Sequence, residues 1–231
     1  MQRIEEQIPE QASDRSEILD ARLSLRTEEL DRTFRETIRT LIRIAAHRDD
    51  ESGAHAKRMG LYTMHLAQRM GLDAGFCSVI SFASPLHDIG KIGISDRILE
   101  KRGALNAGDW KQMRTHAELG AKMLSQNSSP YLVMAADIAR AHHENWDGSG
   151  YPHRLKGEAI PLAARITRLC DSYDALRSRR AYKQAVAHHV AAQAILGGDA
   201  KARPRCFDPA ALAAFESGLE GFRDIFATVR D

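Results

Sequence analysis

The sequence predicts an all-α protein, a bundle of about seven helices preceded by an N-terminal amphipathic helical arm. Apolar residues recur at helical spacing along most of the chain, and the alternating β-branched patterns typical of strands are nearly absent. Clusters of Gly, Pro, Ser and Asn mark the loops between the helices, at 101–108, 126–130, 146–153 and 197–205.

The arm is predicted between residues 16 and 47, a stretch that contains neither Gly nor Pro. Its apolar residues form one stripe, and the opposite face is rich in Arg and Glu. Two interpretations stay open: a helix packed on its own domain, and a short parallel coiled coil that forms a homodimer or links the protein to a sensor. We therefore expect an arm at 1–47 and a second domain at 48–231. The stripe consists of Leu23, Leu30, Phe34, Ile38, Leu41 and Ala45.

The second domain also has helical spacing throughout. Its hydrophobic and charged contents are ordinary for a globular chain, since the whole sequence is 43% hydrophobic and 28% charged. The helices are expected at roughly 54–71, 73–88, 107–125, 130–144, 161–177, 185–196 and 209–218.

Composition limits the partners and the compartment. A formal net charge of +2 does not favour duplex DNA as the main partner. Cys77, Cys170 and Cys206 are widely spaced, which argues against a disulfide framework and against a CxxC zinc site. The sequence has no recognisable N-terminal leader and no stretch of about 18 apolar residues. We therefore expect a cytoplasmic protein that does not enter a membrane.

Histidines and acids near the ends of separate predicted helices indicate a metal site. The segment SPLHDIGKIG, at 84–93, places His87 beside Asp88 in an apolar run. A lone histidine is more often structural, but helical bundles build metal sites from inward-facing side chains of several helices. Eight potential ligands exceed the three or four that one catalytic zinc takes from protein, so two or three metals are expected. The candidates are Glu51, His55, His87, Asp88, His116, His142, His143 and Asp171.

Lys91 lies four residues after His87 and can share a helical face with it. The lysine could cap a helix C-terminus, or it could bind a phosphate oxygen and protonate a departing alkoxide beside a metal. Imidazole and carboxylate ligands without a thiolate favour Fe, Mn or Zn. Paired metals suit phosphoryl transfer, because they stabilise both the attacking and the leaving oxygen.

The motifs HDIGKIG, HHENWDGSGYP and PLAARITRLCDSYDAL together resemble the HD-GYP family of metal-dependent phosphohydrolases, from about Arg48 to Phe215. The resemblance implies an all-helical phosphodiesterase that hydrolyses cyclic di-GMP to pGpG or GMP by means of a metal-activated hydroxide. It implies catalytic roles for Asp88, which would bridge ions, and for Lys91. It also implies iron, with manganese often competent, and a third metal where Glu51 and His55 are both present.

The resemblance further implies a pocket for the dinucleotide beside the metals. The two glycines and the proline around Tyr151 permit tight turns, and its ring offers a stacking face. Asp174 is expected to form hydrogen bonds in support of the site rather than to bind a metal. The residues implied to bind or support substrate are Lys91, Gly150, Tyr151, Pro152, Asp174, Arg180 and Lys183.

Three positions depart from the family pattern: Ser95 and Ala181 stand where proline is usual, and Cys206 stands where histidine is usual. They lie around the expected pocket rim and remove no expected ligand. Two other functions stay open. One is a catalytically weak sensor that binds cyclic di-GMP and contacts proteins such as diguanylate cyclases. The other is a related phosphohydrolase that acts on a different nucleotide.

Overall fold

The computed structural model describes residues 7–48, 53–101, 103–178, 184–198 and 204–230. Within these ranges every regular element is helical, which confirms the predicted fold class. None of the described helices combines the length and the apolar character needed to span a bilayer.

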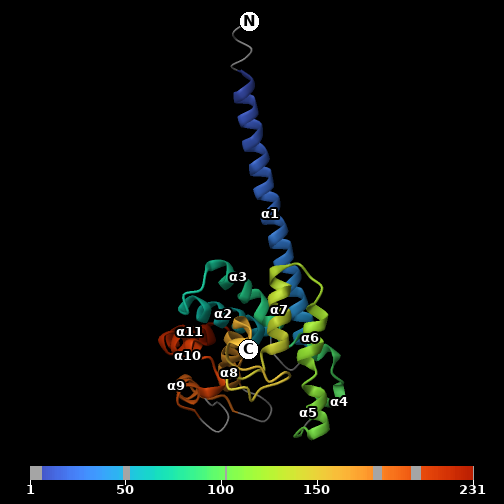
Figure 1. The fold of residues 1–231 in the computed structure, drawn as a ribbon, viewed down its shortest axis with the longest axis vertical. Helices are drawn as coiled ribbons and strands as arrows, with labels where there is room; N and C mark the ends of the chain where they lie inside the picture. Colours follow the sequence, from blue (N-terminus) through green and yellow to red (C-terminus); the bar gives the residue numbers. More distant parts are fainter. Residues whose placement is uncertain (1–6, 49–52, 102, 179–183, 199–203, 231) are drawn as a thin grey trace. The chain divides into compact units, whose positions relative to one another are not determined.

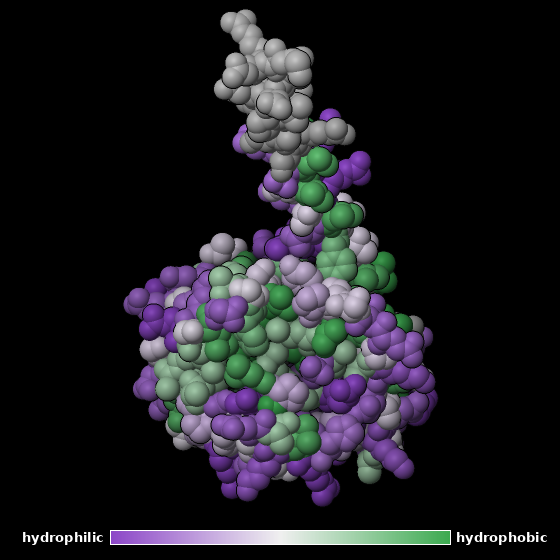
Figure 2. All heavy atoms as spheres, turned by 45° about the horizontal axis from the view of Figure 1, so that its top comes forward, coloured by the Kyte–Doolittle hydropathy of each residue, from purple (hydrophilic) through white to green (hydrophobic). Residues whose placement is uncertain are grey.

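The chain divides into two compact units, Met1–Leu41 and Ile42–Asp231. The boundary that we expected after residue 47 stays a prediction, because helix α1 (Gln7–Arg48) continues without a break through residues 41 and 47. Hydrophobic side chains are exposed along the described part of α1, as Figure 2 shows; Leu23 is 61% exposed and Leu30 is 70% exposed.

Four helices form the centre of the second unit (Figure 1). Helix α2 (Gly53–Arg69) packs against α3 (Ala74–Ala83) and α8 (Leu162–Arg177), and α7 (Pro130–Ala141) packs against α3 and α8. The buried side chains of α2 and α8 recur every three or four residues, so each helix turns one apolar face inward. These helices are close to their predicted positions.

The predicted helix at 107–125 is in fact two helices, α5 (Ala107–Met113) and α6 (His116–Leu124). At the break, the Thr115 hydroxyl donates to the Gln112 carbonyl at 2.7 Å, a local bond that competes with the helical ladder. A short helix, α4 (Asp96–Leu99), precedes them. The break leaves His116 at the start of α6, which packs against α7.

The C-terminal part has one helix more than expected. Helices α9 (His188–Gln193) and α10 (Pro209–Ser217) lie within the predicted ranges, whereas α11 (Leu219–Thr228) was not predicted. Gly218 and Gly221 interrupt the helical signal there. Helix α11 nevertheless packs against α2, where Phe222 is fully buried.

Candidate metal centre

The His–Asp pair lies where the regular helix of α3 ends. Pro85 cannot donate a backbone hydrogen bond, and the chain passes through a 3-10 turn at Ser84–Leu86. A second 3-10 segment, Ile89–Gly93, follows Asp88. A side chain at Gly90 would overlap the His116 carbonyl, so glycine lets this backbone lie directly on the first turn of α6.

One group of potential ligands surrounds Asp88. It comprises Asp88, His116, His142 and His143, each with a ligand atom within 4.8 Å of the others. The Asp88 Oδ1 atom lies 3.1 Å from His116 Nε2 and 3.4 Å from His142 Nε2. Its Oδ2 atom lies 3.3 Å from His87 Nε2, so this carboxylate contacts imidazoles from three segments of the chain.

A second group comprises His55, His87 and Asp171, also with ligand atoms within 4.8 Å of one another. The two groups adjoin, because the ring centroids of His87 and His142 are 5.1 Å apart. Seven of the eight residues predicted as ligands therefore lie in these two groups. The eighth, Glu51, lies outside the described residues.

Local backbone geometry orients three of the imidazoles. The Nδ1 atoms of His87, His116 and His142 lie 2.9, 2.7 and 3.0 Å from the carbonyl oxygen three residues earlier in the chain. A carbonyl can only accept, so each Nδ1 carries a proton, and in the neutral ring Nε2 then holds the lone pair. This tautomer makes Nε2 the metal-binding atom.

Asp174 orients His55 in the same way. Its Oδ2 atom lies 2.8 Å from His55 Nδ1, and Arg58 donates to both carboxylate oxygens, at 2.7 and 3.0 Å. Burial would raise the pKa of Asp174, but His55 and Arg58 outweigh it and hold the pKa at about 2. Asp174 is 1% exposed, so the geometry supports its hydrogen-bonding role and offers no surface for substrate contact.

The electrostatics suit metal binding. Burial lowers the pKa of both His142 and His143, which keeps these rings neutral. Burial would raise the pKa of Asp88, but Lys91 and the neighbouring imidazoles hold it well below its usual range. The Lys91 Nζ atom lies 2.7 Å from Asp88 Oδ2, which places this cation at the cluster. Neutral imidazoles with anionic carboxylates fit Fe, Mn or Zn.

The loop after α7 covers the cluster. A side chain at Gly150 would overlap the backbone of residues 143–145, so glycine lets the loop fold back onto His143. The Tyr151 amide donates to the His143 carbonyl at 3.2 Å, and the Tyr151 ring stacks on the His143 ring with centroids 4.6 Å apart. Burial raises the pKa of Tyr151, so its hydroxyl stays protonated and can donate.

Sequence reasoning missed two supporting residues, Arg58 and Glu144. The Glu144 carboxylate is 2% exposed and accepts from the amides of His153 and Leu155, at 2.7 and 3.1 Å, which ties down the loop. An acid directly after two histidines was a usable signal for Glu144. Nothing in the sequence pattern distinguished Arg58 from the other arginines.

The remaining predicted positions lie around the loop or beyond the described residues. Pro152 lines a pocket beside Tyr151. Ser95 precedes α4 and is exposed, and Cys206 accepts from the Trp146 amide through its carbonyl at 2.9 Å. The positions outside the described residues are Arg180, Ala181 and Lys183.

Comparisons with known proteins agree with this geometry. A family model described as HD domain matches residues 39–210. A cyclic di-GMP phosphodiesterase of Thermotoga maritima is 45% identical over 64% of this chain and 40% of its own length. A 3′3′-cGAMP-specific phosphodiesterase of Vibrio cholerae is 43% identical over 67% of this chain and 30% of its own length. The chain thus spans less than half of either relative.

A solved structure shares the fold. The crystal structure of a cyclic GMP-AMP specific phosphodiesterase of V. cholerae superposes with a TM-score of 0.58 at 21% identity. The match covers 86% of this chain and 50% of that one.

Proposed function

We propose that this chain, which belongs to the HD-domain family and to its HD-GYP branch, is a metal-dependent phosphodiesterase that hydrolyses cyclic di-GMP to pGpG or GMP. One observation carries the proposal: two adjoining groups of imidazoles and carboxylates, in which backbone carbonyls hold the Nδ1 atoms of His87, His116 and His142 and turn their Nε2 atoms toward the cluster. We propose two metals at these groups, a third with Glu51, and iron or manganese as the metal.

Bound metals would supply Lewis acidity, which polarises the phosphodiester and lowers the pKa of a water. The reaction adds a water oxygen to phosphorus and breaks the bond from phosphorus to the 3′ oxygen. We propose that Lys91 stabilises the negative charge that develops on the phosphate. We also propose that it donates the proton that the departing 3′ oxygen needs. Its position 2.7 Å from Asp88 supports this assignment.

The Tyr151 loop would position the dinucleotide. The Tyr151 hydroxyl remains a donor at neutral pH because burial raises its pKa, and its ring stands against His143. We keep Gly150, Pro152, Arg180 and Lys183 as proposed contacts with the substrate. Asp174 is assigned to the support of His55 instead.

The test is metal analysis of anaerobically purified protein, followed by product analysis with cyclic di-GMP. Asp88→Asn should lower kcat by about 1000-fold, since several kcal/mol of transition-state stabilisation depend on the metals. The control is His189→Ala, an exposed histidine outside the cluster. The proposal would be contradicted if Asp88→Asn contained less metal and still hydrolysed cyclic di-GMP at the wild-type rate.

The same assay separates the alternatives. Cyclic di-GMP and 3′3′-cGAMP are offered in parallel, because the V. cholerae relative is named for the second. Binding of cyclic di-GMP without turnover by the metal-loaded protein would favour a sensor that contacts diguanylate cyclases or other proteins. The three cysteines are free, which suits the reducing cytoplasm that we propose as the compartment.

We further propose that the arm forms a homodimer, on the basis of the exposed apolar side chains of α1. Leu23→Glu with Leu30→Glu changes the charge by −2, as does Arg32→Glu alone. Arg32 lies on the opposite face of the helix, and Glu preserves helix propensity. Sedimentation should detect dissociation only in the leucine variant. Equal masses for both variants would contradict the dimer.

A further inference from the structure

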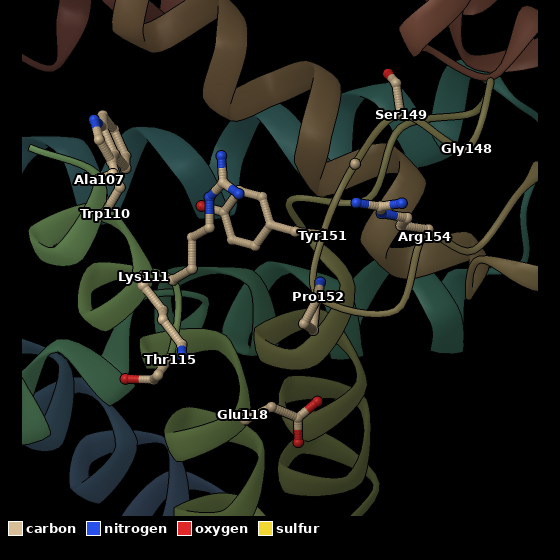
Figure 3. Close-up of a pocket in the computed structure, with 12 residues that line it drawn as sticks. Ala107, Trp110, Lys111, Thr115, Glu118, Gly148, Ser149, Tyr151, Pro152 and Arg154 are labelled. Atoms are coloured by element: carbon tan, nitrogen blue, oxygen red, sulfur yellow. The ribbon is translucent and has the colours of Figure 1, made fainter.

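A pocket of about 800 Å³ lies between α5, the start of α6 and the loop 148–154. Its volume is within the range typical of small-molecule sites, about 300–1,000 Å³. None of the residues that line it is a proposed metal ligand. Figure 3 shows Tyr151 extended from its loop toward α5, which carries Trp110, with Arg154 on the loop side.

The charge of the lining favours an anion. Three cations, Lys111, Arg114 and Arg154, stand against one acid, Glu118. That acid already has a hydrogen-bond partner in His153, at 2.6 Å between Oε1 and Nε2. None of the three cations has an ion-pair partner within the part of the chain that the structure describes. Unpaired cations in one concavity suit a phosphate.

The aromatic lining favours a base. Trp110 lines the pocket and is 47% exposed, so its indole face is open to a ligand. The Arg114 guanidinium lies over the Tyr151 ring, 4.9 Å from its centroid. A purine can stack on an exposed indole, and such stacking tolerates any base because every base has a π-face.

The pocket adjoins the metal centre through one side chain. Tyr151 lines the pocket and also stacks on His143, a member of the Asp88 ligand group. A substrate with one phosphate at the metals can therefore extend past Tyr151 and place a second nucleotide in this pocket. Phosphate and base are the two chemistries for which the lining is suited.

We propose that this pocket is a subsite for the second nucleotide of a cyclic dinucleotide, with Trp110 stacking on its base and with Lys111 and Arg114 holding the phosphate that is not cleaved. This inference rests on the proposed phosphodiesterase function. It adds the residues that would select a cyclic dinucleotide over smaller phosphodiesters. It assigns binding, not chemistry, to these three residues.

The test compares two substrates of different reach. Cyclic di-GMP can occupy both regions, whereas bis(p-nitrophenyl) phosphate carries a single phosphate and no nucleobase. Trp110→Ala should lower the ratio of kcat/KM for cyclic di-GMP to that for bis(p-nitrophenyl) phosphate by about tenfold, through KM. Trp110→Phe should restore most of the ratio, because a ring remains for stacking.

Lys111→Gln tests the phosphate contact, with Lys122→Gln as the matched control on an exposed part of α6. Lys111→Gln should lower the same ratio about fivefold and weaken its dependence on salt, whereas Lys122→Gln should change neither. Unchanged ratios in both Trp110→Ala and Lys111→Gln would overturn the subsite, even if the wild-type chain cleaves cyclic di-GMP.

Failure of the proposed function has a different signature. If the wild-type chain binds cyclic di-GMP without cleaving it, the dissociation constant is measured by calorimetry in place of KM. The subsite still predicts that Trp110→Ala binds cyclic di-GMP about tenfold more weakly than the wild-type chain. If the wild-type chain neither binds nor cleaves cyclic di-GMP, the subsite is overturned together with the function.

Discussion

Tyr151 contacts two regions that are built in different ways. Toward His143 lies the candidate metal centre, where most of the imidazoles are buried, the carboxylates of Asp88 and Asp171 are half-buried, and backbone carbonyls orient His116 and His142. Toward Arg114 lies the pocket, where the cations have no ion-pair partner among the described residues. The comparison shows that the side chains of a buried polar cluster must form their hydrogen bonds before a ligand binds. The charged side chains of an open pocket can stay without an ion-pair partner until the ligand binds.

The largest effect should follow from a change that touches only the buried region. Asp174→Asn removes the negative charge that faces Arg58, and both side chains are 1% exposed. Because removal of one partner of a buried ion pair is strongly destabilising, the free energy of unfolding should fall by about 3–5 kcal/mol. Denaturant unfolding of the metal-free protein measures it.

The control for this prediction is an exposed pair of the same charge type. Asp224→Asn breaks the contact of Asp224 with Arg223, whose side chains are 66% and 52% exposed, and stability should not change measurably. Equal unfolding midpoints for Asp174→Asn and the wild-type chain would show that the buried pair does not hold the second ligand group in place.

A smaller effect should follow from a change at the wall that the two regions share. In Gly150→Ala the new methyl group would lie 2.5 Å from the His143 carbonyl oxygen, so the loop must shift and carry Tyr151 with it. A displacement of about 1 Å in a positioning group can cost about 100-fold in rate, and we expect that loss in kcat/KM for cyclic di-GMP.

Gly103→Ala is the control for the loop, because a side chain at Gly103 would meet no atom within 4 Å. Activity and metal content should both match those of the wild-type chain. Activity of Gly150→Ala within twofold of the wild type would show that the position of Tyr151 does not matter to the reaction.

The orientation of the candidate metal ligands was largely predictable because it depends on short-range geometry. The Nδ1 bonds of His87, His116 and His142 reach only three residues back, so the local motif contains the orienting partner as well as the ligand. The convergence of these motifs needed either the family resemblance or the fold. Arg58 escaped prediction because its partner, Asp174, is 116 residues away.

The loop side of the pocket, with Tyr151, was expected from the sequence, but its α5 side could not be predicted, because it depends on where separate segments come to lie. Its α5 wall exists as a distinct element only because the helix expected at 107–125 breaks before His116. Helical periodicity continues across that break and gives no sign of it. Trp110 and Lys111 therefore looked like residues of one amphipathic helix, and nothing in the sequence related them to Tyr151.

The smallest effect should follow from a change confined to the pocket side. Asp109 precedes Trp110 and closes the capping box of α5, because its carboxylate accepts from the Asn106 amide at 3.2 Å and from Lys101. The Lys101 hydrogen bond, which outweighs desolvation, lowers the pKa of Asp109 below its usual value. Asp109→Asn should lower Tm by about 2–4 °C at neutral pH, as expected for a lost cap, and leave metal content unchanged.

The pH dependence gives this prediction its sign. A carboxylate whose pKa is lower in the folded state stabilises the protein above its unfolded-state pKa, and that stability is lost as the pH falls through the folded-state pKa. The difference in Tm between the wild-type chain and Asp109→Asn should therefore shrink in acid. Asp137→Asn, on α7 beside Arg140, where the Asp137 side chain is 47% exposed, should show no such difference at either pH. A difference in Tm that stays constant as the pH falls would mean that the Asp109 charge does not stabilise α5. The position of Trp110 would then depend on packing alone.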